Sequence, residues 1–164
     1  MSDSDTSGLT QLGAPTGYRY DHPDAAILES FANQHAGSPW VVGLDCAEFT
    51  SLCPVTGQPD YGRIHIHYVP GARCVESKSL KLYLGAYRNH GAFHEDCVNR
   101  IADDLVAVIE PRWLRVFGDF AARGGIAIRP LALRFAPGLS DDERAACVEL
   151  VAQHDSSMGR RPAL

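Results

Sequence analysis

Residues 62–70 read GRIHIHYVP, and their strict alternation of side chains is the clearest structural signal in the chain. Ile64, Ile66 and Tyr68 fall on one face of an extended segment, while the two histidines of the stretch fall on the other. The pattern predicts a β-strand with one buried face and with its histidines toward the surface.

A second strand is predicted just upstream, at residues 39–51, PWVVGLDCAEFTS, because tryptophan and the paired valines favour extended structure. Residues 48–62, EFTSLCPVTGQPDYG, overlap its end. Two prolines and two glycines interrupt this stretch, so we expect neither a helix nor a central strand there. It should instead form a loop that carries Cys53.

The remaining elements are predicted from hydrophobic periodicity. Apolar residues recur three or four positions apart in two segments, which is typical of amphipathic helices, and Ser140 or Asp141 can cap a third helix. Glu95 and Asp96 lie in the first turn of the strongest one, and Pro111 ends it. The set comprises helices at residues 76–90, 93–111 and 140–154, and strands at residues 112–120 and 126–135 joined by a turn at 121–125.

The order of the central elements is strand, strand, helix, helix, strand, strand, which is typical of an α+β fold with an antiparallel sheet. Such a sheet leaves two open edges, so we expect a homo-oligomer that pairs them. We divide the chain into an N-terminal arm at residues 1–36, a central domain at 37–137, and a C-terminal helix and tail at 138–164. The arm should be partly disordered, with a short helical piece at residues 23–33, and the tail from residue 155 onward should be loose.

The 164 residues carry a formal net charge of −5 and include five cysteines. The acidic balance argues against a nucleic-acid partner, whose phosphates need clustered lysine and arginine. The N-terminus has neither a basic start nor an apolar run, and no segment approaches the length of a membrane helix. We therefore expect a cytoplasmic protein with reduced thiols and no membrane partner.

Cys53 is the first candidate for chemistry. A thiolate is a strong nucleophile, and a loop position leaves it accessible, whereas the alternative is an inert, buried cysteine. Asp60, seven residues later, can act as an acid or base if the loop folds back. Alternatively, PDYG is a simple turn with aspartate in a favoured position, and the local sequence favours that interpretation.

The motif FHEDC places three more candidates at the start of the helix at residues 93–111. His94 can donate a proton, and Glu95 can accept hydrogen bonds from N–H groups of a ligand. Charge complementarity with the helix N-terminus would explain Glu95 without a ligand. Cys97 either packs in the core or approaches Cys53, where a second thiol can trap an oxidised one reversibly as a disulfide.

Positive charge for a phosphate is available from two lysines and an arginine. Lys78 and Lys81 share a helical face, and Arg123 can add a planar fork of donors. The alternative is a solvated basic face. No Gly-x-Gly-x-x-Gly motif occurs, so the sequence does not indicate a Rossmann-type nucleotide site.

The seven histidines raise the question of a metal site. His65 and His67 share a strand face, and His90 and His94 lie four positions apart, so either pair can be combined with a cysteine around zinc. Neither a Cys-x-x-Cys nor a His-Glu-x-x-His motif accompanies them. We expect no metal, and we expect His65 and His67 to face the surface.

Four blocks together carry a resemblance to a known family: EFTSLCPVTGQPDYG, VESKSLKLYL, RNHGAFHEDCVNRI and ARGGI. They resemble the NADPH-dependent 7-cyano-7-deazaguanine reductases, the nitrile reductases of queuosine biosynthesis, a tRNA modification pathway, in their short single-module form. The resemblance runs from about residue 40 to 130. It implies the tunnel fold (T-fold) for the catalytic domain at residues 37–137, with subunits joined edge to edge into barrels and active sites between them.

The resemblance also implies a role for each matching residue. Cys53 stands at the position of the nucleophile and Asp60 at that of the proton donor, with His94 available to shuttle protons. The matches to the stretches that hold the deazapurine base are Val75, Glu76, Ser77, His94 and Glu95. The matches to positions associated with the NADPH phosphates are Lys78, Lys81 and Arg123. The remaining cysteines, Cys46, Cys74 and Cys147, are interpreted as packing residues.

The expected activity is the four-electron reduction of the nitrile of 7-cyano-7-deazaguanine to an aminomethyl group through a thioimide on Cys53, with NADPH and without a metal. Thiolate addition makes the nitrile carbon easier to reduce, because it divides one hard step into two. Two alternatives stay open. One is a zinc-dependent GTP cyclohydrolase with the same fold, and the other is a non-catalytic tunnel-fold module that binds a purine-like base.

Overall fold

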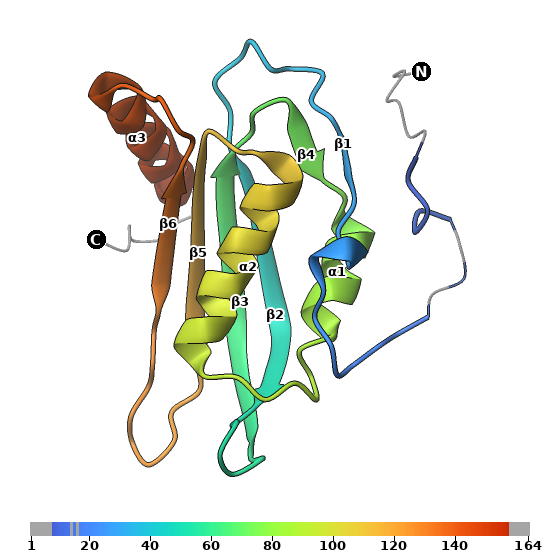
Figure 1. Cartoon of the computed structure of the whole chain (residues 1–164). Helices are drawn as coiled ribbons and strands as arrows, with labels where there is room; N and C mark the ends of the chain where they lie inside the picture. The colour runs from blue at the N-terminus through green and yellow to red at the C-terminus, as the bar shows by residue number, and fades with distance from the viewer. Residues whose placement is uncertain (1–7, 14, 16, 158–164) are drawn as a thin grey trace.

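The computed structural model describes the chain except for residues 1–7, 14, 16 and 158–164. Its centre is a four-stranded antiparallel sheet in the order β2-β3-β5-β6 (Figure 1). The strands are β2 (Val42–Leu52), β3 (Pro59–Val69), β5 (Trp113–Phe120) and β6 (Leu131–Phe135). The α+β class with an antiparallel sheet is therefore confirmed.

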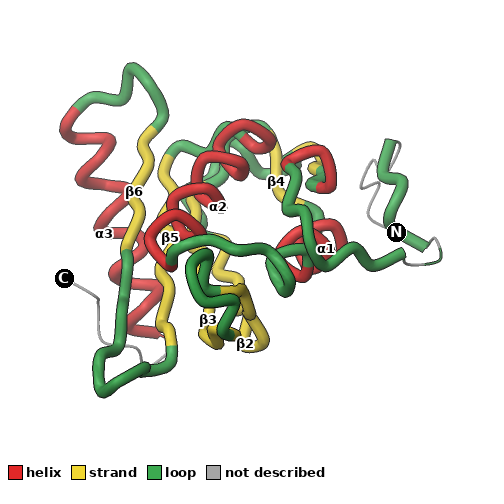
Figure 2. Tube along the Cα trace, turned by 60° about the horizontal axis from the view of Figure 1, so that its bottom comes forward, coloured by secondary structure: helices red, strands yellow, loops and turns green. Residues whose placement is uncertain are grey.

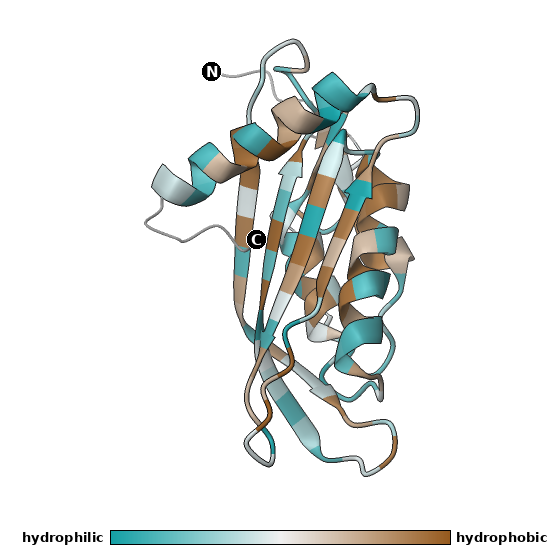
Figure 3. Cartoon of the chain, turned by 90° about the vertical axis from the view of Figure 1, so that its left-hand side faces the viewer, coloured by the Kyte–Doolittle hydropathy of each residue, from teal (hydrophilic) through white to brown (hydrophobic). Residues whose placement is uncertain are grey.

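Helices lie on both sides of this sheet. α2 (His94–Ile109) covers one face, and α1 (Ser77–Gly85) lies on the same side, beyond β2 (Figures 1 and 2). α3 (Asp141–Ser157) crosses the opposite face (Figure 3). Within the described residues, no helix combines the length and apolar character that crossing a membrane would require.

The alternating strand predicted at residues 62–70 is an interior strand of this sheet. β3 pairs with β2 on one side and with β5 on the other. The side chains of Ile64, Ile66 and Tyr68 are almost fully buried in the main core, as predicted. The expectation of a surface position is wrong for His67, which is 1% exposed. It is buried because α3 packs over that end of the sheet. The periodicity of the strand alone gives no sign of this helix.

The stretch at residues 48–62 contains more strand than predicted. β2 continues to Leu52 and β3, an interior strand, begins at Pro59, so only six residues form the loop. Proline is accepted at the first position of a strand, where no ladder donor is required. The prediction that the whole stretch lies outside a central strand is therefore wrong at both ends.

A small second sheet was missed by the sequence patterns. β1 (Ser30–Ala32) pairs with β4 (Arg73–Val75), and each strand has only three residues, too few to display a period of two. The helical piece predicted at residues 23–33 is a single 3-10 turn, η1 (Ala25–Ile27), capped by Asp24.

Three predicted bounds also need correction. α1 ends at Gly85 rather than at residue 90, and the strand predicted at 126–135 is confined to β6, which begins after Pro130. α3 continues to Ser157, so the first residues of the supposedly loose tail are helical. The rest of that tail, and the tip of the N-terminal arm, lie outside the described residues.

α2 packs closely on β5 because Gly118 has no side chain. A Cβ atom there would lie 2.9 Å from Cγ2 of Val98 and 2.6 Å from Cε2 of Phe120. The apolar stripe of the helix, including Ile101 and Leu105, is fully buried. This seating brings the first residue of α2, His94, over the beginning of β3, where the candidate site lies.

Candidate active site

Cys53 begins the tight loop between β2 and β3, as predicted. Its N–H donates to the carbonyl of Gln58 at 2.9 Å, and its own carbonyl accepts from the N–H of Gly57 at 2.9 Å. Gly57 adopts a φ of 66°, a left-handed conformation that glycine tolerates without strain. These bonds close the loop into a turn that leaves the thiol of Cys53 half-buried.

The connection between α1 and α2 lies against this loop (Figure 2). Leu52 donates its N–H to the carbonyl of His90 at 3.0 Å and accepts from the N–H of Ala92 at 3.1 Å. Between them, Gly91 lies so close that a Cβ atom there would be 3.3 Å from Cα of Pro54. The loop that carries Cys53 and the start of α2 are therefore fixed to each other by backbone contacts.

The loop favours the ionised form of Cys53. A hydrogen bond from the Thr56 side chain lowers the pKa of the thiol to about 7, with further contributions from the N–H groups of Thr56 and Val55 and from Arg123. Donors directed at sulfur stabilise the thiolate more than the thiol. The loop thus provides the nucleophilic form of the residue near neutral pH.

Asp60 is a buried residue of β3, 4% exposed, and not part of a surface turn. The local interpretation of PDYG as a simple turn is therefore wrong. Its Oδ2 lies 3.2 Å from Nε2 of His94, and its Oδ1 lies 3.1 Å from Nη1 of Arg123. The carboxylate thus connects the first residue of α2 with the turn that follows β5.

His94 is held by stacking as well as by Asp60. Its ring lies parallel to that of Phe120, with centroids 4.0 Å apart and an interplanar angle of 17°. One turn further along α2, Cys97 is fully buried, and burial raises its thiol pKa to about 12. Cys97 is a core residue here, and all five cysteines are free thiols.

The residues predicted to hold the base lie in two places, at the start of α2 and at the junction of β4 and α1. Glu95 is exposed at the start of α2, and its carboxylate makes no hydrogen bond or ion pair to any described residue. Val75 ends β4, and Ser77 begins α1. Glu76, between them, caps α1 by accepting from the N–H groups of Lys78 at 2.8 Å and Ser79 at 2.7 Å, a contact that the sequence did not reveal.

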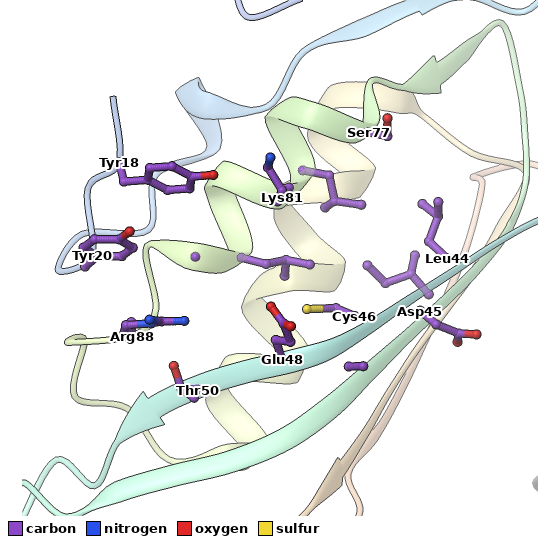
Figure 4. A pocket seen from close by; sticks show the side chains of 15 residues that line it. Tyr18, Tyr20, Leu44, Asp45, Cys46, Glu48, Thr50, Ser77, Lys81 and Arg88 are labelled. Atoms are coloured by element: carbon purple, nitrogen blue, oxygen red, sulfur yellow. The ribbon is translucent and has the colours of Figure 1, made fainter. Parts of the chain in front are cut away.

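A groove of about 610 Å³ lies between β2 and α1 (Figure 4), and Cys53 is not among the residues that line it. Lys81 of α1 and Arg88, in the turn after that helix, line it and face the stacked rings of Tyr18 and Tyr20 of the N-terminal arm, whose centroids are 5.6 Å apart. Ser77 lies at one end. Sequence reasoning missed both tyrosines, although aromatic residues stand out in an otherwise polar arm.

The three cations predicted to bind phosphates are not gathered in one place. Lys81 lines this groove, and Nζ of Lys78 donates to the carbonyl of Gln11 at 2.6 Å. Arg123 instead lies beside Asp60. Within one chain, the structure therefore joins Arg123 to the candidate catalytic residues.

The described residues include one group with metal-ligand chemistry: His67, His154 and Asp155. It differs from the histidine pairs considered above. Arg115 donates to Asp155 at 2.8 Å and lies 3.2 Å from Nδ1 of His67. A guanidinium has only donors, so Nδ1 must accept and the proton of a neutral His67 lies on Nε2. A cation would need that nitrogen unprotonated and would meet a positive charge, so the cluster fits an ion-pair network rather than a metal site.

Comparisons with known proteins identify the relatives of this chain. The chain matches the family described as QueF-like protein over residues 59–136. The NADPH-dependent 7-cyano-7-deazaguanine reductase of Streptococcus mutans is 50% identical over 147 residues, covering 89% of this chain and 90% of that protein. The reductase of the same name from Porphyromonas gingivalis is 54% identical over 130 residues, covering 79% of this chain and 84% of that protein.

A solved structure extends the likeness to the fold. The crystal structure of an archaeosine synthase QueF-Like in the apo form superposes with a TM-score of 0.55 at 20% identity, covering 63% of this chain and 99% of that one. The 50 to 54% identity to the reductases covers more of the chain, so it indicates the family more specifically than this likeness of fold does. The chain belongs to the family of NADPH-dependent 7-cyano-7-deazaguanine reductases.

Proposed function

We propose that this chain reduces the nitrile of 7-cyano-7-deazaguanine to the aminomethyl group, with NADPH as the reductant, in queuosine biosynthesis. The observation that carries the proposal is a half-buried thiol with a lowered pKa whose loop leads directly into a buried carboxylate, Asp60. The relatives that are 50 to 54% identical bear the name of this reaction. Neither alternative, the zinc cyclohydrolase or the non-catalytic module, has comparable support.

The first step is addition of Cys53 to the nitrile. Sulfur bonds to the nitrile carbon, one π bond of the C≡N group opens, and the nitrogen takes a proton, giving a thioimide. Asp60 can receive the thiol's proton and deliver it to that nitrogen, so the step balances without another reactant. A buried carboxylate with fixed neighbours is suited to this transfer, since its orientation is set before the substrate arrives.

Two reductions complete the reaction, and bound NADPH supplies a hydride for each. Cys53 leaves as thiolate after the first hydride has reached the carbon, which produces an imine, and the second hydride yields the amine. Each reduction also needs a proton. His94, whose Nε2 lies 3.2 Å from Asp60, is placed to restore protons to the carboxylate.

The chain offers donors of the right kind for the phosphates of NADPH. Lys78 and Lys81 lie on one face of α1, and the groove beside Lys81 adds Arg88 and two aromatic rings. Ammonium and guanidinium groups bind phosphate oxygens through charge-assisted hydrogen bonds. We assign Lys78 and Lys81 to the cofactor, and we re-examine Arg123 below.

The base of the substrate is assigned to the residues that the resemblance indicated. The free carboxylate of Glu95 can accept two N–H groups of a guanine-like edge, and Val75 and Ser77 can supply an apolar and a polar contact. The carboxylate of Glu76 is already engaged by the N–H groups of α1, so Glu76 supports the site through the helix.

We propose further that the chain adopts the tunnel fold and assembles into a barrel with active sites between subunits. β2 and β6 are the edges of the four-stranded sheet, and each can add a strand from another copy. In one chain, Ser77 lines the groove at α1 while Cys53 lies in the loop at the other end of β2. An assembly that joins sheet edges would explain how separated base-binding groups meet.

Turnover tests the proposed function directly. Purified protein with 7-cyano-7-deazaguanine should oxidise two molecules of NADPH for each aminomethyl product, followed by absorbance and by mass spectrometry of the product. Cys53→Ala should abolish turnover, whereas Cys147→Ala, a change at a cysteine of α3 that lies outside both the loop and the groove, should retain it. Absence of product with wild-type protein, or full activity of Cys53→Ala, would reject the assignment.

A further inference from the structure

Arg123 occupies a turn that is built to hold its side chain in place. Its N–H and carbonyl exchange hydrogen bonds with Ile126 at 3.0 and 3.1 Å, around two glycines with φ of 58° and 82°. The N–H of Ala121 donates to the carbonyl of Tyr61 at 2.8 Å, which fastens this turn to β3. The backbone of Arg123 is therefore fixed beside the strand that carries Asp60.

The guanidinium of Arg123 contacts two parts of the candidate site. Nη1 lies 3.1 Å from Oδ1 of Asp60 and 3.5 Å from Oε1 of Gln58. Gln58 in turn accepts the N–H of Cys53 through its backbone carbonyl at 2.9 Å. Arg123 thus reaches both the carboxylate and the loop that carries the thiol.

The guanidinium also acts on the thiol. A hydrogen bond from the Arg123 side chain contributes to the lowered pKa of Cys53, since a donor at sulfur favours the thiolate over the thiol. Arg123 reaches the nearly buried Asp60 from the surface, and its own side chain remains 37% exposed.

We propose that Arg123 is a positioning residue for the Cys53–Asp60 pair in the ligand-free protein. It holds Oδ1 of Asp60, so that Oδ2 stays directed at His94, and its charged donor group favours the thiolate of Cys53. This role is distinct from the phosphate contact that the resemblance implied. Its meaning for the reaction rests on the proposed function, but its test does not.

The test measures the rate of alkylation of Cys53 by iodoacetamide against pH, without substrate or cofactor, by mass spectrometry of the Cys53 peptide. In Arg123→Gln the midpoint of the pH profile should rise by up to about half a unit, since a neutral amide stabilises the thiolate less than a guanidinium does. Arg123→Lys should recover part of the shift, because it keeps the charge without the fork. Arg129→Gln removes a charge from the exposed pair with Asp119 and should leave the profile unchanged.

An unchanged midpoint in Arg123→Gln, with only a raised KM for NADPH, would overturn the proposal and make Arg123 a phosphate ligand. If Arg123→Gln does not fold, Arg123→Lys decides by the same criterion: a raised midpoint supports the proposal and an unchanged one overturns it. Failure of the proposed function is separate, since it would appear as absent turnover in the wild-type protein whatever the alkylation profile shows.

Discussion

The short loop that Cys53 begins lowers the pKa of its thiol. Neither burial nor a helix N-terminus lowers its pKa; hydrogen bonds from Thr56, from loop N–H groups and from Arg123 do so. Because the folded-state pKa is about 7, the thiolate predominates above that pH and is lost as the pH falls through it. Alkylation of Cys53 by iodoacetamide should therefore slow about tenfold for each pH unit below that midpoint.

Removing the hydroxyl of Thr56 tests this account of the thiol. Thr56→Val keeps the shape of the side chain but removes the largest contribution to the lowered pKa, so the pKa should rise toward its ordinary value of 9.0. A rise of about one unit would slow alkylation of Cys53 near pH ~7 about fivefold. Thr56→Ser keeps the hydroxyl and should match the wild-type profile; equal profiles for valine and serine would contradict the role of the hydroxyl.

Individual residues show where the sequence was sufficient and where it was not. The prolines and glycine around Cys53 correctly predicted an accessible loop. Asp60 could not be placed by local patterns, since its partners, His94 and Arg123, come from segments 34 and 63 positions away. His67 was misplaced for the same reason, because only the packing of α3 buries its face of β3.

At the scale of elements, α1 depends on an unusual cap. Glu76 accepts from two N–H groups of the first turn and is only 5% exposed. Glu76→Ala should lower the free energy of unfolding by about 1 to 2 kcal/mol, as loss of an N-cap does, measured by urea denaturation. Glu110 also has a carboxylate that makes no ion pair with a described residue, but Glu110→Ala is a poor control. The backbone of Glu110 is left-handed, so the substitution would change backbone strain as well.

A better matched control for the cap is Glu48→Ala, an exposed glutamate outside any helix, which should change stability by less than about 0.5 kcal/mol. Wild-type stability in Glu76→Ala would show that the carboxylate does not stabilise the helix, and a loss of substrate affinity alone would assign Glu76 to the base instead.

α3 is attached to the sheet through a nearly buried ion pair. Arg115 and Asp155 are 12% and 3% exposed, and Asp155→Ala would leave the arginine without its partner. Calorimetry or urea denaturation should show a loss of about 3 to 5 kcal/mol, whereas Glu149→Ala on the exposed face of α3 should be nearly neutral. A small effect of Asp155→Ala would mean that apolar contacts of Cys147 and Val151 hold the helix alone.

Long, regular elements were predictable, and short ones were not. α2 matched its prediction because its apolar stripe repeats over sixteen residues between an acidic first turn and Pro111. β1 and β4 have three residues each and are specified by their mutual pairing rather than by their own sequences. Their pairing also places Val75 and Glu76 at the start of α1, so the missed sheet positions part of the candidate site.

At the scale of the whole molecule, the two edges of the sheet carry the assembly hypothesis. Gly118 N–H donates to the carbonyl of Pro130, and Ala136 N–H donates to that of Arg112. Since bonding direction alternates along a strand, even-numbered residues of β6 turn their backbone groups toward β5 and Leu133 turns its groups outward. Leu131 and Leu133 are also 40% and 44% exposed.

Leu133→Pro should therefore disrupt assembly without breaking the β5–β6 ladder, because proline removes an outward donor. Sedimentation velocity should show the wild-type protein as an oligomer and the proline variant as a smaller species. Leu133→Thr, which keeps the N–H and a strand-favouring side chain, should assemble normally. A monomeric wild-type protein would contradict the barrel.

The family was predictable because four separate motif blocks occur in the right order in the central part of the chain. Physical patterns alone gave the α+β class and the elements, but not the activity. The separation of Ser77 and Lys81 from Cys53 could not be foreseen, since it depends on how α1 lies beyond β2 (Figure 1).

The central claim is that Cys53 forms a covalent thioimide, and intact-mass spectrometry without NADPH tests it most directly. Reduced protein incubated with 7-cyano-7-deazaguanine should gain the mass of one substrate molecule, and Cys53→Ala should gain nothing. Formation of the adduct should slow in Asp60→Asn, which cannot carry the proton to the nitrile nitrogen. Folded, reduced wild-type protein that binds the substrate but shows no mass increase would contradict the account.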